Sequence, residues 1–191
     1  MGVALWLVPP PAERAVIQKI MDSHPPSNRS RSPKSYPHFE PHITLAASLP
    51  SSLTPATILA SVPPGAPGAP KLRARFKSIE AGDVYFRSVY IDIEASPELI
   101  QLRDDIHAKL REHASVHPKA PRFPHMSLYY IDDADAAERR TAAEDLQGQT
   151  QTHGGGTLKL GGLSGFDGAE IWVVRCEGPV AEWAPLAKMD Y

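Results

Sequence analysis

Two short segments of the chain carry the same pattern of residues that could do chemistry. Residues 41–45 read Pro-His-Ile-Thr-Leu, and residues 124–128 read Pro-His-Met-Ser-Leu. Imidazole titrates near about pH 6.5, so one of two such rings can accept a proton while the other donates one. The hydroxyl groups of threonine and serine can hydrogen-bond the oxygens of a phosphate and stabilise charge that develops in a transition state. Together these side chains are suited to opening a phosphodiester by general acid/base catalysis.

The spacing within each motif places its two polar side chains together. In a strand, residues two apart point to the same face, so His42 and Thr44 share one face, and His125 and Ser127 do the same. One such motif in an apolar strand is typical of a packed histidine. Two motifs, each preceded by proline and followed by leucine, indicate a shared cleft instead. We therefore predict these four residues as catalytic, with the roles of acid and base shared between the two histidines.

The elements that must position the motifs are indicated by hydrophobic spacing and capping residues. Two helices begin with a capping residue and a proline, at Thr54-Pro55 and Ser96-Pro97. Strands are expected over residues 3–8, 42–47, 71–80, 84–94, 123–130, 157–166 and 170–178, and helices over 12–23, 53–62, 96–114 and 134–148. Residues 23–38 and 63–70 are rich in Pro, Ser and Gly, and both are expected to be surface loops. The loop at residues 23–38 is basic, and it could alternatively form a mobile lip over the site.

The order of these elements indicates a repeat. His125 and Ser127 follow His42 and Thr44 by 83 residues each. In each unit a motif strand precedes a helix and then a hairpin whose turn contains Gly and Asp. The pattern predicts an α+β fold and one bilobal domain over residues 1–191, with approximate repeat units 39–95 and 122–178. We expect two lobes related by a pseudo-twofold axis, each an antiparallel sheet backed by helices, with a central cleft.

Composition narrows the classes of protein to which the chain can belong. Its 191 residues suffice for one domain with a real core, and a net charge of -2 gives no field that would attract nucleic acid or a membrane. The one cysteine, Cys176, excludes an internal disulfide and favours a reducing compartment, so a cytoplasmic location is expected. The apolar start of the chain is short and broken by prolines, as in a first strand. His113, His117 and His125 span a helix end and a loop, so neither a metal site nor another cofactor is expected.

At this point the sequence resembles the two-histidine (2H) phosphoesterase superfamily, and within it the fungal and plant 2′,3′-cyclic nucleotide 3′-phosphodiesterases, or cyclic phosphodiesterases. The resemblance rests on the two motifs and on the segments 4–10, 84–94 and 124–130. It implies metal-independent hydrolysis of 2′,3′-cyclic nucleotides to nucleoside 2′-phosphates. It also implies hydrolysis of ADP-ribose 1″,2″-cyclic phosphate to ADP-ribose 1″-phosphate in tRNA-splicing metabolism. By the same resemblance, His42, Thr44, His125 and Ser127 match the catalytic tetrad.

Two aromatic residues are further candidates for contacting substrate. Tyr130 matches the tyrosine of an H-x-S-x-x-Y pattern that contacts substrate in enzymes of this family. A regular strand would point it away from the face of His125 and Ser127, so it reaches the cleft only if the strand ends or bulges near Tyr129. Phe86, on the first hairpin, is placed at the cleft to stack a base, although aromatic residues in strands are more often part of the core.

Two other classes of function stay open on these residues. The chain could be an RNA-end processing enzyme of the same superfamily, related to 2′-5′ RNA ligases or to a 3′-exonuclease, or a catalytically silent module that binds RNA or nucleotides. Small size and the lack of a continuous basic signature favour a small-molecule cyclic phosphate over RNA 3′ ends as the partner. We expect a monomer that does not associate with a membrane.

Overall fold

The computed structural model describes the chain except residues 1, 24–30, 66–70, 114–115 and 154–156. Residues 24–30 and 66–70 of the two predicted surface loops therefore lie outside the described residues. The strands are β1 (Val3–Val8), β2 (Ile43–Leu49), β3 (Arg73–Val84), β4 (Arg87–Ile93), β5 (His125–Tyr129), β6 (Gln151–His153), β7 (Thr157–Lys159), β8 (Gly165–Asp167), β9 (Glu170–Arg175) and β10 (Ala184–Asp190). The α-helices are α1 (Pro11–Asp22), α2 (Pro55–Leu59), α3 (Pro97–Leu110) and α4 (Glu138–Gly148).

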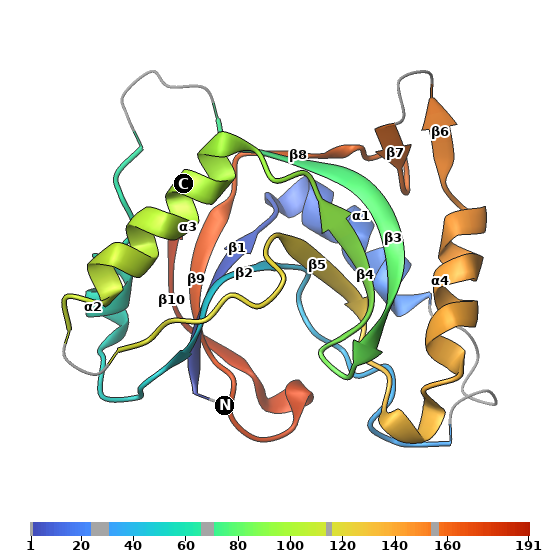
Figure 1. The fold of residues 1–191 in the computed structure, drawn as a ribbon, viewed down its shortest axis with the longest axis horizontal. Helices are drawn as coiled ribbons and strands as arrows, with labels where there is room; N and C mark the ends of the chain where they lie inside the picture. The colour runs from blue at the N-terminus through green and yellow to red at the C-terminus, as the bar shows by residue number, and fades with distance from the viewer. Residues whose placement is uncertain (1, 24–30, 66–70, 114–115, 154–156) are drawn as a thin grey trace.

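The motif strands lie at the centre of the main sheet. Eight antiparallel strands follow the order β10-β9-β1-β2-β5-β4-β3-β8, and β6 and β7 form a separate pair. The two central strands, β2 and β5, are joined through the pair Ile43 and Met126. The sheet therefore consists of two four-stranded halves that meet at the two motifs (Figure 1). The predicted α+β class, with antiparallel sheet and helices, is confirmed.

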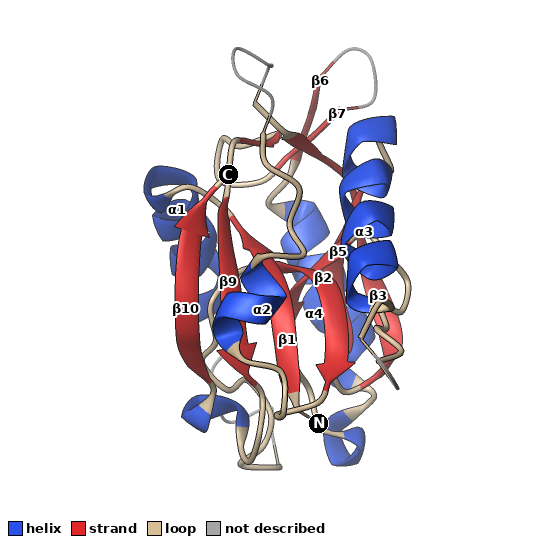
Figure 2. Ribbon diagram, turned by 90° about the vertical axis from the view of Figure 1, so that its left-hand side faces the viewer, coloured by secondary structure: helices blue, strands red, loops and turns tan. Residues whose placement is uncertain are grey.

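Helices back both halves of the sheet. The helix α4 packs on β3 and β4, whereas α2 packs on β9 and β10, and Figure 2 shows α2 lying across its half of the sheet. As predicted, α2 and α3 begin at capped prolines: Thr54 accepts a hydrogen bond from the Thr57 N–H, and Ser96 accepts one from the Leu99 N–H. No helix in the described ranges is both long enough and apolar enough to cross a membrane.

Each motif strand ends a strand–helix–strand unit. The order β1-α1-β2 is matched by β4-α3-β5, and in both units the two strands pair with each other in the sheet. This arrangement gives the two halves their pseudo-twofold relation. The repeat bounds 39–95 and 122–178 stay a prediction.

The hairpin expected between residues 157–166 and 170–178 is wrong. β8 pairs with β3, whereas β9 pairs with β1 and β10, so the turn at Gly168 carries the chain from one half of the sheet to the other. The reason is burial on both faces: Ile171, Trp172, Val173 and Val174 are all buried. An uninterrupted apolar run of this kind is typical of a strand in the interior of a sheet, and β9 lies between β1 and β10.

The strand β1 is likewise covered on both faces, and this shapes the site. Its residues Val3, Leu5 and Leu7 belong to the large core under the helices, while Ala4, Trp6 and Val8 form a second apolar cluster with Trp172, Val174 and Cys176. Alternate residues of a strand point to opposite faces, so the second cluster lies on the other face of the sheet. Trp6, Ala4 and Cys176 from this cluster line the cleft described next.

Candidate active site

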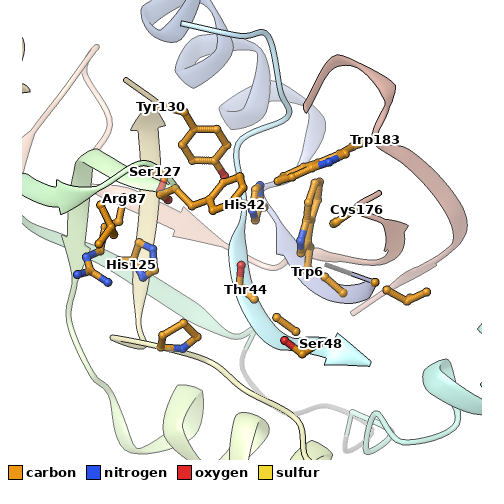
Figure 3. A pocket seen from close by; sticks show the side chains of 17 residues that line it. Trp6, His42, Thr44, Ser48, Arg87, His125, Ser127, Tyr130, Cys176 and Trp183 are labelled. Carbon is orange, nitrogen blue, oxygen red and sulfur yellow. The ribbon is translucent and has the colours of Figure 1, made fainter. Parts of the chain in front are cut away.

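A cleft of about 430 Å³ collects all six residues that the sequence singles out. It is lined by the four motif residues and by the two aromatic candidates: His42, Thr44, His125, Ser127, Tyr130 and Phe86. Figure 3 shows the motif side chains of the two central strands facing this common space. The structure therefore brings together residues that are far apart in the chain, as the predicted convergence of the motifs requires.

The register of the central strands explains the convergence. Ile43 pairs with Met126, so the middle residues of the two motifs lie side by side. In an antiparallel pair, the residue that precedes Ile43 lies opposite the residue that follows Met126, and the residue that follows Ile43 lies opposite the one that precedes Met126. His42 is thus placed near Ser127, and Thr44 near His125. Each histidine therefore has a hydroxyl from the other strand next to it.

Backbone carbonyls fix the tautomer of both imidazoles. The Nδ1–H of His42 donates to the carbonyl of Glu40 at 2.7 Å, and the Nδ1–H of His125 donates to the carbonyl of Arg122 at 3.0 Å. A carbonyl can only accept, so in each ring Nδ1 carries the proton. The unprotonated Nε2 of each ring is then the nitrogen that can exchange a proton with a bound molecule.

Burial makes both rings hard to protonate. His42 is 6% exposed, and this burial lowers its pKa to about 4, with a smaller contribution from His125. Burial is also the largest cause that lowers the pKa of His125, and the positive charges of Arg87 and Arg122 add to it. Both imidazoles are therefore neutral at neutral pH, and an anion bound between them would favour a proton on one.

The ring of His42 is held by aromatic packing that the sequence analysis missed. Trp6 stacks on it with centroids 3.6 Å apart and planes 7° apart, and Phe39 meets it edge-on at 6.1 Å. Trp6 pairs with Thr44 across β1 and β2, which places the indole on the cleft face. The sequence does not show that Trp6 packs at the site, because the burial of β1 on both faces depends on the distant strand β9.

A bulge in β5 decides which of the two adjacent tyrosines faces the cleft. Ser127 pairs with Tyr90, and Tyr129 pairs with Val89, so β5 holds one extra residue, Leu128, between these pairs. An extra residue reverses the alternation of faces, and Tyr130 returns to the face of Ser127. The strand also ends at Tyr129, so both conditions set for Tyr130 in the sequence analysis are met.

Tyr129 points to the opposite side of the sheet. Its hydroxyl donates to the carbonyl of Ile20 in α1 at 3.3 Å, and its ring meets Tyr36 edge-on at 5.4 Å. Tyr130 instead stacks on Phe39, with centroids 3.9 Å apart, and burial raises the pKa of its hydroxyl well above the usual range. The Tyr130 hydroxyl is therefore a neutral donor at the cleft.

One side of the cleft is an aromatic surface. Phe86 stacks on Trp183 at 5.7 Å with planes 29° apart, and it meets Tyr130 edge-on at 5.4 Å. Phe86 is 41% exposed, so part of its ring is free to receive a flat ligand group. Trp183 comes from the segment before β10, and no local pattern in the sequence marks it as a cleft residue.

Two other residues of the cleft differ in character. Cys176 is buried there, and burial raises the pKa of its thiol to about 12, so the thiol stays protonated. Arg87 brings a positive charge to the cleft, and the sequence analysis did not single it out.

Among the described residues, no group of three or more His, Cys, Asp and Glu side chains could hold a metal ion.

The fold of the chain is similar to that of known proteins. Among solved structures, E. coli LigT in its apo form is similar, with a TM-score of 0.57 and 16% identity over 99% of this chain and 96% of that one. LigT complexed with 3′-AMP gives a TM-score of 0.55 and 17% identity over 99% of this chain and 97% of that one. These likenesses support the fold.

The family of the chain is shown by its sequence. Residues 1–191 match the family model described as cyclic phosphodiesterase-like protein, and the chain belongs to this family. It is also similar to the 2′,3′-cyclic-nucleotide 3′-phosphodiesterase of Yarrowia lipolytica, with 27% identity over 100% of both chains. The enzyme of the same name from Neurospora crassa is 24% identical over 98% of both chains. The predicted class of enzyme, a cyclic phosphodiesterase, is confirmed.

Proposed function

We propose that the enzyme hydrolyses 2′,3′-cyclic nucleotides to nucleoside 2′-phosphates and ADP-ribose 1″,2″-cyclic phosphate to ADP-ribose 1″-phosphate, without a metal ion. The observation that carries this proposal is the pair of neutral imidazoles in one cleft, each with an unprotonated Nε2 and with a hydroxyl of the facing strand beside it. The names of the fungal relatives support the 2′,3′-cyclic substrate.

The four motif residues divide the work of hydrolysis. One histidine takes a proton from water on its Nε2 as the water oxygen bonds to phosphorus. The bond from phosphorus to O3′ breaks, and O3′ receives a proton from the Nε2 of the other histidine, so the phosphate stays on O2′. The acidic histidine gains its proton when the anionic substrate binds, since a nearby negative charge favours the imidazolium.

The hydroxyls of Thr44 and Ser127 stabilise the non-bridging oxygens. In the unliganded cleft the Ser127 hydroxyl donates to the carbonyl of Phe86 at 2.9 Å. To donate to phosphate it must rotate away from this carbonyl. Its bond to Phe86 thus holds the hydroxyl near its working position until substrate arrives.

The aromatic surface gives the substrate its orientation. We assign the base, or another flat group, to the exposed face of Phe86, and the hydroxyl of Tyr130 to the ribose phosphate. The single cysteine supports a location in the cytoplasm, and the small cleft supports small molecules as substrates. We further assign the enzyme to tRNA-splicing metabolism, as a monomer.

The test is incubation with adenosine 2′,3′-cyclic phosphate in EDTA, followed by separation of the two possible products. Adenosine 2′-phosphate as the only product is expected. The 3′-phosphate would contradict the assignment of the leaving oxygen, and loss of activity in EDTA would contradict catalysis without a metal. Turnover of RNA ends without turnover of mononucleotides would replace the proposal by RNA-end processing. ADP-ribose 1″,2″-cyclic phosphate is the second substrate to be compared.

A further inference from the structure

We infer that Arg87 binds an anionic group that the substrate carries in addition to its cyclic phosphate, and that the enzyme favours ribose cyclic phosphates with a phosphate on the 5′ oxygen. This rests on the proposed function, which supplies the cyclic phosphate between the histidines. Arg87 is the first residue of β4, and its side chain lines the cleft with 18% of its surface exposed.

The guanidinium of Arg87 has hydrogen-bonding capacity to spare. Its nearest carboxylate, on Asp83, is 3.5 Å away and 89% exposed, so water screens that pair. Its Nε is buried and has no hydrogen-bond partner in the described ranges of the chain. Buried donors usually have partners, and a guanidinium matches the geometry of a phosphate with two parallel hydrogen bonds. The exposed part of the guanidinium, which makes only the screened contact with Asp83 among the ion pairs of the described residues, can donate to an anion in the cleft.

The position of Arg87 separates it from the reacting phosphate. Figure 3 shows Arg87 on the far side of His125 from His42, beyond the space between the two imidazoles. Arg122 is not part of the lining of the cleft, but its charge also acts on His125, and its guanidinium lies 5.7 Å from the ring of Tyr90, where that of Arg87 lies 5.8 Å away. The cleft therefore has a cationic end beside His125.

The opposite end of the cleft is apolar. Trp6, Cys176 and Trp183 lie on the side of His42 in Figure 3. In a nucleoside cyclic phosphate, the base on C1′ and the 5′ carbon on C4′ lie on the same face of the ribose, but they diverge from the two carbons that flank the ring oxygen. A base on the aromatic surface thus directs the 5′ oxygen toward Arg87. The 5′-phosphate of a mononucleotide and the preceding phosphodiester of an RNA end share this position, and ADP-ribose carries its pyrophosphate on the corresponding 5″ oxygen of a ribose without a base.

The experiment compares adenosine 2′,3′-cyclic phosphate with and without a 5′-phosphate, each enzyme at its pH of maximal rate. Arg87→Met keeps the length of the side chain and removes the charge. It should lower kcat/KM for the 5′-phosphorylated substrate by about 10- to 100-fold, the loss expected for charged hydrogen bonds, and change the other substrate by less than about threefold. For the 5′-phosphorylated substrate, the kcat/KM of Arg87→Lys should lie between those of the unmodified enzyme and Arg87→Met, because lysine keeps the charge and loses the planar guanidinium.

The matched control is Arg140→Met in α4, where the arginine is exposed and pairs with Glu144. This variant should leave kcat/KM for both substrates and the melting temperature unchanged. Equal losses on both substrates in Arg87→Met, or no loss on either, would overturn the inference. ADP-ribose 1″,2″-cyclic phosphate and a dinucleotide with a cyclic end then show which source of the anion depends more on Arg87.

If the unmodified enzyme turns over neither cyclic substrate, the proposed function fails, and calorimetry tests the anion site by itself. Adenosine 5′-phosphate should bind the unmodified chain more tightly than adenosine does, and Arg87→Met should remove that difference. Equal affinity of the two enzymes for adenosine 5′-phosphate would overturn the site.

Discussion

Replacing His42 by glutamine should remove much of the acid sensitivity of folding. The pKa of His42 is about 4 in the folded chain, against an ordinary value of 6.5. Between these values the unfolded chain binds the proton and the folded chain does not, so stability is full above about pH 6.5 and falls as the pH drops toward 4. From pH 7.5 to pH 5 this one ring should cost about 2 kcal/mol of the free energy of unfolding.

The assay is urea unfolding of the two proteins at pH 7.5 and pH 5. Glutamine is neutral at both pH values, and its amide can donate to the carbonyl of Glu40 as the ring Nδ1–H does. Other titrating groups are common to both proteins, so they cancel when the two pH differences are subtracted. The free energy of unfolding should therefore fall by about 2 kcal/mol less in His42→Gln than in the unmodified chain.

An equal pH dependence in both proteins, within about 0.5 kcal/mol, would refute the reasoning. It would mean that His42 keeps an ordinary pKa in the folded chain, and that its stacking on Trp6 does not exclude water. The proposed mechanism needs a neutral ring at rest, so this result would bear on function as well as on stability.

Three further predictions concern catalysis. His42→Ala and His125→Ala should each lower kcat on adenosine 2′,3′-cyclic phosphate by about 10²-fold or more with an unchanged circular dichroism spectrum; full activity in either variant would end the two-histidine mechanism. Thr44→Ala and Ser127→Ala should each cost about 10- to 10³-fold in kcat, because each loses one hydrogen bond to phosphate; a change only in KM would instead show uniform binding. The pH profile of kcat/KM should be bell-shaped. Its acidic limb should lie below pH 6.5, because the pKa of both histidines is lowered in the folded chain. An acidic limb above pH 6.5 would contradict the proposal that both imidazoles are neutral in the unliganded enzyme.

Local rules were sufficient for the parts of the site that depend on one strand at a time. The spacing of two residues put His42 beside Thr44 and His125 beside Ser127, because alternation of faces is a property of any strand. The starts of α2 and α3 were equally local, since a capping hydroxyl and a proline act within one turn.

The second hairpin could not be predicted from neighbouring residues. The Asp-Gly turn before β9 is typical of a hairpin, but partners far along the chain settle its use. β9 pairs with β1, which precedes it by more than 160 residues, and its continuous apolar run suits this interior place in the sheet.

By itself the sequence determined the α+β class, the four motif residues and the need for a cleft between them. Only the tertiary structure decided that Tyr130 and not Tyr129 enters the cleft, since this depends on where β5 holds an extra residue against β4. Only the tertiary structure brought Trp6, Trp183 and Arg87 to the motifs, from strands and turns that no local pattern links to them. The physical reason is that face alternation is fixed within a strand, whereas the surroundings of a side chain depend on every element packed against it.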